Sequence, residues 1–436
     1  MSTPATLRAV KQGAPEYLAL LASLARRGES DLDRVEPAVR EILAAVRSEG
    51  DVALKRFVER FEKRPLPKAW VQRDYGGEAA LRSLPAPVAE ALVEAAARIR
   101  RYHERQAQAL GGFEYKEGGV TLGSRVTPLA RVGVYAPGGK ARYPSSVLMC
   151  AVPAQVAGVQ EIIVACPDTS PEVRAACHLA GVHALLDAGG AQAVAALAYG
   201  TQSVPRVDKI VGPGNIYVAA AKRLVFGEVD IDSIAGPSEI LVVADDSADP
   251  VLVAADLLSQ AEHDEAAYPL LVTSSEALVA RVQAELARQL SDLPRVAIAE
   301  VSVRNNGFAL VVPDRDALVS VANQLAAEHV AVHTVEARAL ADRILRAGAI
   351  FVGSMTPEAA GDYLAGPSHV LPTGGAARYG APLGVYDFVS RTSIIDYEAG
   401  ALIEQGPKIT AFARAEGLEA HARAVEYRTL RKPKRL

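Results

Sequence analysis

The chain has 436 residues and a formal net charge of −4, and half of its residues are hydrophobic. A chain of this length exceeds one ordinary domain core, so we expect two or more domains. The slightly acidic balance gives no reason to expect nucleic acid as a partner, and proline or charge interrupts every apolar run before the roughly 20 residues that a membrane span needs.

Three cysteines, at positions 150, 166 and 177, lack the CxxC spacing of a thiolate metal site and are an odd number for a disulfide framework. The N-terminus also lacks the basic and apolar regions of a signal peptide. We therefore expect a cytoplasmic protein.

The first 110 residues or so carry apolar residues at helical spacing, for example in 16–26, 39–47, 51–61 and 88–99. These predicted helices contain no residue pattern that indicates a catalytic or binding site. From Arg131 the pattern changes to short β-rich runs that alternate with helices. The runs are 132–135, 161–165, 184–186 and 209–211, then 240–244, 269–273, 308–312, 330–334 and 350–352. This alternation predicts an α/β protein with two Rossmann-like parallel-sheet domains and helical N-terminal and C-terminal extensions.

Three glycine-containing loops, at 136–139, 187–192 and 212–215, follow predicted strands of the first series. Such a loop offers free backbone N–H groups at a helix N-terminus, which suit a phosphate or a carboxylate. The last loop lacks the third glycine of a dinucleotide fingerprint, so nucleotide binding stays one of two interpretations. Lys140 and Arg142 follow the first loop and face either a cofactor phosphate or solvent.

Two short stretches offer side chains for chemistry. Gln260 and His263 are three residues apart near the end of a predicted helix, where they share one face and can aim at a metal ion or a polar substrate. Glu328 and His329 close another predicted helix, and a helix C-terminus raises the pKa of a nearby His and disfavours an ionised Glu. Each pattern is also compatible with an ordinary helix end. The turn-rich stretch 361–375 is a third candidate, because such stretches often carry sites.

Eight motifs run in order over residues 125 to 421 and together closely resemble the histidinol dehydrogenase family. They are Arg131-Val-Gly-Val-Tyr-Ala-Pro-Gly-Gly, Gly189-Gly-Ala-Gln, Val207-Asp-Lys-Ile-Val-Gly-Pro-Gly-Asn, Asp230-Ile-Asp-Ser-Ile-Ala-Gly-Pro-Ser-Glu, Leu257-Leu-Ser-Gln-Ala-Glu-His, Ala327-Glu-His, Gly361-Asp-Tyr-Leu-Ala-Gly-Pro-Ser-His-Val-Leu-Pro-Thr and Glu416-Gly-Leu-Glu-Ala-His.

The resemblance implies an enzyme that oxidises L-histidinol to L-histidine through L-histidinal in two NAD-linked steps, at the end of histidine biosynthesis. It implies one zinc ion per subunit, held by Gln260, His263, Asp362 and His421. The catalytic pair would be Glu328 and His329. The residues that would bind histidinol are Ser238, Gln260, His263, His329, Asp362, Glu416 and His421. NAD would contact Tyr135, Gln192 and Asn215.

The resemblance further implies a homodimer in which the C-terminal segment, residues 386–436, crosses to the partner, so that His421 completes the other subunit's site. The expected domains are an N-terminal helical segment, 1–31, a first Rossmann-like domain of 32–134 with 237–385, and a second, NAD-binding one of 135–236. In step one we expect His329 to take the hydroxyl proton as hydride leaves carbon. In step two we expect Glu328 to deprotonate a water that adds to the aldehyde, and no cysteine is required.

Two other interpretations compete. A relative in the same superfamily could oxidise another small alcohol, such as a sulfopropanediol, with the same Glu-His pair; the presence of Glu416 and His421 favours histidinol. A two-domain ligand-binding protein without catalysis would also have paired α/β lobes, but it would have no use for Glu328 and His329. The role of His369 stays open.

Overall fold

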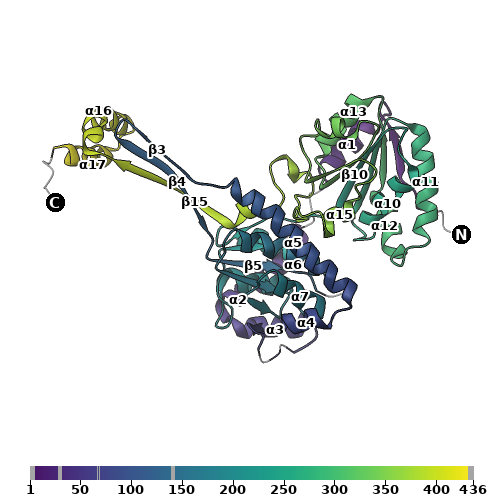
Figure 1. The fold of residues 1–436 in the computed structure, drawn as a ribbon, viewed down its shortest axis with the longest axis horizontal. Helices are drawn as coiled ribbons and strands as arrows, with labels where there is room; N and C mark the ends of the chain where they lie inside the picture. Colours follow the sequence, from purple (N-terminus) through teal and green to yellow (C-terminus); the bar gives the residue numbers. More distant parts are fainter. Residues whose placement is uncertain (1–4, 28–31, 66, 68, 139–142, 431–436) are drawn as a thin grey trace. The chain divides into compact units, whose positions relative to one another are not determined.

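The structure, a computed structural model, describes residues 5–27, 32–65, 67, 69–138 and 143–430. The chain divides into two compact units, one of residues up to 106 together with 129–388, and one of 107–128 together with the residues from 389 on. The first unit holds two largely parallel sheets, each covered by helices on both faces (Figure 1). The predicted α/β class with Rossmann-like sheets is confirmed. None of the helices in the described ranges is long and apolar enough to cross a membrane.

The first sheet has six parallel strands in the order β1-β12-β11-β10-β13-β14. The strands are β1 (Arg8–Lys11), β10 (Glu239–Ala244), β11 (Tyr268–Thr273), β12 (Phe308–Val311), β13 (His329–His333) and β14 (Ala349–Val352). Its central strands are hydrophobic without alternation, because helices bury both of their faces.

Two helix layers cover this sheet (Figure 1). The helices α1 (Tyr17–Ala25), α13 (Arg315–Leu325) and α14 (Ala337–Ala341) pack on the face that presents Leu241 and Val243. The helices α10 (Pro250–Ala261), α11 (Glu276–Leu290) and α12 (Val296–Asn306) pack on the face that presents Ile240 and Val242. The short helix α15 (Glu358–Tyr363) follows β14 and contacts α10.

The second sheet has the order β2-β7-β6-β5-β8-β9, parallel except for β2 at the edge. Its strands are β2 (Val71–Gln72), β5 (Arg131–Tyr135), β6 (Glu161–Ala165), β7 (Ala184–Leu186), β8 (Lys209–Val211) and β9 (Asp230–Ile231). From the central β5 the chain fills one side with β6 and β7 and then crosses to β8 on the other. The strand order therefore reverses between β5 and β8, which is where open α/β sheets usually bind ligands.

Helices cover both faces of the second sheet as well. One layer has α2 (Leu32–Glu49), α3 (Asp51–Phe61), α8 (Gly190–Tyr199) and α9 (Ile216–Val225). The other has α5 (Ala86–Gln108), α6 (Pro144–Val156) and α7 (Pro171–Leu179), with α4 (Gly77–Ser83) packed on α7.

The sheet membership differs from the expected domain boundaries in the N-terminal third of the chain. Residues 32–134 were expected to belong with 237–385, but α2 and α3 pack on the second sheet and β5 lies at its centre. The segment expected to be only helical, residues 1–31, supplies the edge strand β1 of the first sheet. Helical periodicity alone carries no information about which sheet a helix covers.

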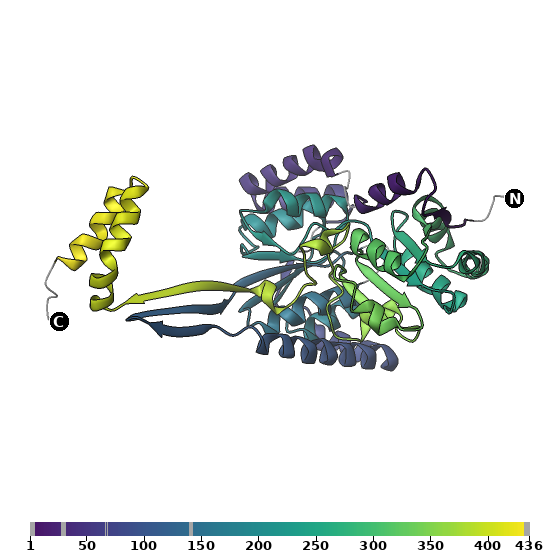
Figure 2. The same cartoon turned by 90° about the horizontal axis from the view of Figure 1, so that it is seen from above.

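The second unit is built from chain segments far apart in the sequence. The strands β3 (Phe113–Glu117), β4 (Val120–Pro128) and β15 (Val389–Tyr397) form an antiparallel sheet in the order β15-β4-β3. A helix pair follows, α16 (Ala399–Ala415) and α17 (Glu419–Thr429), which Figure 2 shows in yellow beyond the strands. The sequence pattern did not predict these strands, whereas the helix pair agrees with the expected helical C-terminal extension.

Candidate active site

The first candidate group lies at the end of α10. Asp249 caps this helix by accepting a hydrogen bond from the Val251 N–H at 2.9 Å, and Pro250 occupies its first turn. Gln260 is in the last turn and is buried, whereas His263 lies two residues past the helix, in a turn closed by its own N–H and the Gln260 carbonyl. The two side chains are therefore set by a helix end and a turn, not by one continuous helical face.

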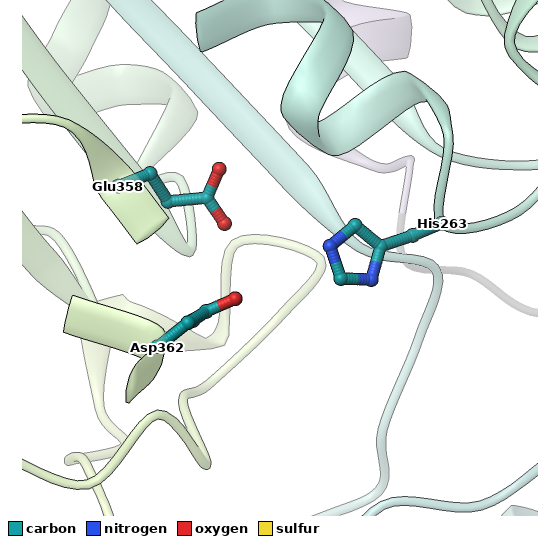
Figure 3. Close-up of side chains that lie close together, drawn as sticks. All are labelled: His263, Glu358 and Asp362. Atoms are coloured by element: carbon teal, nitrogen blue, oxygen red, sulfur yellow. The ribbon is translucent and has the colours of Figure 1, made fainter. Parts of the chain in front are cut away.

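The helix α15 brings two carboxylates to the same place. Glu358 and Asp362 are four residues apart, so they lie on one face of the helix. One ligand atom each of His263, Glu358 and Asp362 lies within 4.8 Å of the others, and Figure 3 shows the three side chains converging. The predicted residues His263 and Asp362 are thus brought together. Glu358 was not predicted, although its spacing from Asp362 could have indicated it.

Glu358 also organises the neighbouring side chains. The Gln260 amide nitrogen donates to its two carboxylate oxygens at 2.8 and 3.1 Å, in the amide orientation that pairs donors with acceptors. The Ser259 hydroxyl donates to Glu358 Oε2 at 2.8 Å. Because the amide nitrogen is held by Glu358, the Gln260 oxygen is the free end of the amide and can act as a ligand.

The electrostatics of this cluster suit a bound cation. Burial, followed by the negative charge of Asp362, raises the pKa of Glu358 to about 8. Burial also acts to raise the pKa of Asp362, but His369, with Nδ1 at 3.6 Å from Asp362 Oδ1, leaves it below its usual value. Two buried carboxylates side by side repel each other unless a positive charge lies between them. Together with a histidine and an amide oxygen, they form a donor set that fits zinc.

The second candidate group corrects the sequence prediction. Helix α13 ends at Leu325, because Ala326 adopts a left-handed conformation with φ of 44°. Glu328 lies in the following connection, and His329 is the first residue of β13. The pair does not close a helix, so a helix C-terminus is not the cause of any shift in the two pKa values, and the expected rise for His329 was wrong.

The ring of His329 is held in one tautomer. Its Nδ1 lies 2.9 Å from the Glu239 carbonyl oxygen, which only accepts hydrogen bonds, so Nδ1 carries the proton. The other nitrogen, Nε2, is buried and has no hydrogen-bond partner among the described residues. It lies 3.6 Å from Glu358 Oε1, on the side of the carboxylate cluster. The unprotonated nitrogen is thus free to accept a proton from a substrate.

Burial has opposite effects on the two members of this pair. It lowers the pKa of His329 to about 4, so the ring is neutral near pH 7. Burial and then the nearby charge of Glu239 raise the pKa of Glu328 well above its usual value. The rise for Glu328 agrees in direction with the prediction, but its cause is burial. The neutral imidazole has an open lone pair at Nε2, and the raised pKa of Glu328 means that this carboxyl group takes up a proton more readily than an ordinary glutamate.

The glycine loops of the second sheet lie at the carboxyl ends of its strands. Gly212 follows β8 with φ of +110°, and a Cβ there would meet the Tyr135 carbonyl oxygen at 2.1 Å, so only glycine fits. Its N–H donates to Asp232 Oδ2 at 2.7 Å and its carbonyl accepts from Lys222 Nζ at 3.0 Å. Lys222 and Asp232 form a buried ion pair. This network fixes a backbone loop at the reversal point of the sheet, a placement that fits a dinucleotide.

The three residues expected to contact NAD lie in or next to the loops at the carboxyl ends of the strands. Tyr135 is buried, and its hydroxyl accepts a hydrogen bond from the Gly190 N–H at 3.0 Å. Gln192 is buried in the first turn of α8. The Asn215 side chain caps α9 by accepting from the N–H groups of Tyr217 and Val218. Tyr135 and Asn215 thus hold their loops in place, and Lys140 and Arg142 fall outside the described residues.

The remaining predicted residues are distributed over both units. Ser238 directly precedes β10, and its carbonyl oxygen accepts from the Tyr268 N–H at 2.9 Å. Glu416 ends α16 and His421 lies in α17, both in the second unit. The cysteines are buried free thiols, and burial raises the pKa of each. This leaves them poor nucleophiles, in agreement with the expectation that no cysteine takes part.

Comparison with known proteins places the chain in a family. A family model described as histidinol dehydrogenase matches residues 25–429. Histidinol dehydrogenase of Halalkalibacterium halodurans is 51% identical over 411 residues, which cover 93% of this chain and 96% of the relative. That of Pseudomonas aeruginosa is 47% identical over 443 aligned positions, covering 99% of each chain. The crystal structure of histidinol dehydrogenase from Elizabethkingia anophelis matches with a TM-score of 0.90 at 31% identity, covering 98% of this chain and 99% of that one. The chain belongs to the histidinol dehydrogenase family.

Proposed function

We propose that this protein oxidises L-histidinol to L-histidine in two successive NAD-linked steps, with a zinc ion that positions the substrate. The observation that carries the proposal is the geometry of His329, whose Nδ1–H is bound by Glu239 while the buried Nε2 stays open beside the carboxylate cluster. A neutral histidine with a fixed ring and an open Nε2 beside the carboxylate cluster can serve as a general base. The family of the chain supplies the substrate.

The residues proposed to hold the zinc ion are Gln260, His263 and Asp362 of one subunit, together with His421 contributed by the other subunit. Glu358 lies close to His263 and Asp362 and is a further acidic partner of the ion. When bound, the ion supplies a fixed attachment point for the substrate, and NAD accepts the two hydrides. Ser238 and Glu416 are proposed to bind the substrate, and the loops that contain Tyr135, Gln192 and Asn215 are proposed to bind NAD.

In the first step, His329 Nε2 accepts the hydroxyl proton of histidinol while the carbon gives up hydride, so the alcohol becomes an aldehyde. The neutral state of His329 makes this transfer available near pH 7. The Nδ1–H group keeps donating its hydrogen bond to the Glu239 carbonyl oxygen, which fixes the ring orientation throughout the step.

In the second step, the Glu328 carboxylate takes a proton from a water molecule as the water oxygen adds to the aldehyde carbon. The hydrate that forms then gives up the second hydride, and the product is a carboxylic acid. The Glu239 N–H donates to Glu328 Oε2 at 3.0 Å, which fixes the carboxylate next to His329. The raised pKa of Glu328 makes the ionised group a stronger base.

The direct test combines metal analysis with the yield of NADH per histidinol. We expect one zinc ion per chain and two NADH molecules for each histidinol consumed. Sulfopropanediol, offered under the same conditions, should give no NADH. A yield of one NADH, or turnover of sulfopropanediol in place of histidinol, would overturn the proposal.

We also propose that the protein is a homodimer in which His421 of one subunit completes the zinc site of the other. A mixture of two inactive variants, His421→Ala and Glu328→Gln, tests this. Shared sites predict that mixed dimers regain activity, because one of their two sites contains neither substitution. If mixing at subunit-exchange conditions leaves both variants inactive, each site belongs to one chain.

The three buried free thiols support the further proposal that the protein works in a reducing compartment, the cytoplasm.

A further inference from the structure

A buried ion pair joins the N-terminal segment to the first sheet. Arg27 follows α1, and its Nη2 donates to Glu239 Oε2; both side chains are 1% exposed. Its Nη1 donates to the carbonyl oxygens of Leu24 at 2.7 Å and Leu325 at 3.0 Å. One guanidinium therefore connects the end of α1, the end of α13 and the start of β10.

Glu239, the partner of Arg27, touches both proposed catalytic residues. Its backbone N–H donates to Glu328 Oε2 at 3.0 Å, and its carboxylate accepts from the Glu328 N–H at 3.2 Å. Its carbonyl oxygen accepts from His329 Nδ1 at 2.9 Å. The second carboxylate oxygen accepts from the Gly374 N–H. The position of this single residue thus sets the position of Glu328 and His329 together.

From these contacts we propose that Arg27 is a positioning residue for catalysis, acting through Glu239 on Glu328 and His329. The inference rests on the proposed function, because it assigns those two residues their roles. Among the described residues, the hydrogen bonds of Arg27 go to Leu24, Leu325 and Glu239, and not to Glu328 or His329. Arg27 places a positive charge against the Glu239 carboxylate, which is buried beside Glu328.

The physical reason is the cost of an unpaired buried charge. Removing one partner of a buried ion pair is far more harmful than removing both, since the remaining charge is left without compensation. Without Arg27, the Glu239 carboxylate loses its buried cationic partner and shifts from its position. This shift weakens its bonds to the Glu328 and Gly374 N–H groups. A displacement of about 1 Å at a reacting group can lower a rate roughly 100-fold.

A double-mutant cycle separates positioning from a purely structural role. We would compare Arg27→Met, Glu239→Gln and the double variant with the wild type for both half-reactions, from histidinol and from histidinal, as the full-length zinc-loaded enzyme. Zinc content and thermal midpoint are measured on the same samples. Arg223→Met is the matched control, because it removes an ion pair to Glu36 on the second sheet's helices.

We expect Arg27→Met to lower kcat about 100-fold in both half-reactions, with KM for histidinol within about threefold and zinc content unchanged, since α10 and α15 supply the zinc ligands of this unit. The kcat of the double variant should be about tenfold higher than that of Arg27→Met. Arg223→Met should keep kcat within about twofold.

Three results would overturn the inference. The first is a kcat of Arg27→Met within about twofold of wild type. The second is a loss of kcat that matches the unfolded fraction, and the third is a kcat of the double variant no higher than that of Arg27→Met alone.

If Arg27→Met does not fold, Arg27→Lys keeps the charge while losing the forked contacts. It should lower kcat about tenfold at unchanged zinc content, and an unchanged kcat would count against the role. If the wild type makes no NADH from histidinol, the proposed function fails first, independently of Arg27.

Discussion

The two sheets of the first unit carry their polar groups at opposite ends of the strands. In the first sheet, Glu239 and His329 open β10 and β13, so the candidate catalytic pair lies at the amino ends. In the second sheet, the glycine loops around Gly190 and Gly212 follow β7 and β8, at the carboxyl ends. Carboxyl-end loops are the usual ligand sites of parallel sheets and are rich in recognisable turn residues. The proposed amino-end site is one to which this rule does not point.

If the amino ends of β10 and β13 hold the chemistry, removing the free nitrogen of His329 should have the largest effect. In His329→Asn, the amide can still donate to the Glu239 carbonyl but offers no base in place of Nε2. We expect kcat for histidinol oxidation to fall by about 10² to 10⁴, with zinc content unchanged. Stopped-flow measurement of the first NADH formed checks this. An activity near that of the wild type would remove the catalytic role from this end of the sheet.

The acidic cluster next to this pair is tested by Glu358→Gln. Glutamine has one charge less and cannot accept from the Gln260 amide at both positions. We expect zinc affinity to fall about 10-fold to 100-fold, measured by competition with a chelating dye in the absence of substrate. Glu336→Gln, which alters an exposed partner of Arg315, is the control and should bind zinc normally. Unchanged affinity in Glu358→Gln would mean that Glu358 does not support the ion.

The carboxyl ends of the second sheet should respond to a different substitution. Gly212→Ala places a methyl group against the Tyr135 carbonyl oxygen and strains a backbone with φ of +110°. We expect KM for NAD to rise about tenfold while zinc content stays the same. Gly227→Ala is a close control, with a φ of +101° and no described atom within 4 Å of the added carbon. A rise of the same size in both variants would show that strain alone, not the loop at β8, affects NAD.

The smallest expected effect concerns the stability of the metal-free protein. The pKa of Glu328 is raised in the folded state above its ordinary value near 4.5, so the folded chain keeps a proton that the unfolded chain releases. The free energy of unfolding therefore falls as the pH rises through that window. Glu328→Gln removes this loss, and its thermal midpoint at pH 8 should exceed that of wild type by about 2 °C, with no difference near pH 4. If Glu328→Gln were less stable than the wild type at pH 8, the buried Glu328 carboxylate would not be destabilising the folded protein.

The contrast between the two sheets also explains what the sequence could predict. Strands such as β5 and β8, with their glycine loops, were predicted nearly to the residue, because hydrophobic runs followed by turn formers are local signals. The predicted boundary between α13 and β13 was wrong, because the left-handed residue that ends α13 is Ala326 and not a glycine. Helical spacing continued past it, so nothing local separated Glu328 from the helix.

Other parts of the site depend on contacts that no local pattern reveals. Glu358 was missed because the segment after Gly353 shows little regularity, although its spacing to Asp362 fits one helical turn. The pairing of β4 with β15 joins residues about 270 positions apart, and Arg27 meets Glu239 across 212 positions. Both depend on tertiary structure, which sequence periodicity does not encode.

The pairing of β1 with β12 has a consequence for how the protein is made. Arg8 lies opposite Phe308 in the register of the first sheet, 300 positions later in the chain. At a synthesis rate of about 5 to 20 residues per second, the nascent N-terminal strand waits about 15 to 60 seconds for its neighbour to leave the ribosome. The strands of the second sheet are all complete by Ile231, well before that moment. Translation thus completes all strands of the second sheet before the last strands of the first sheet have been made.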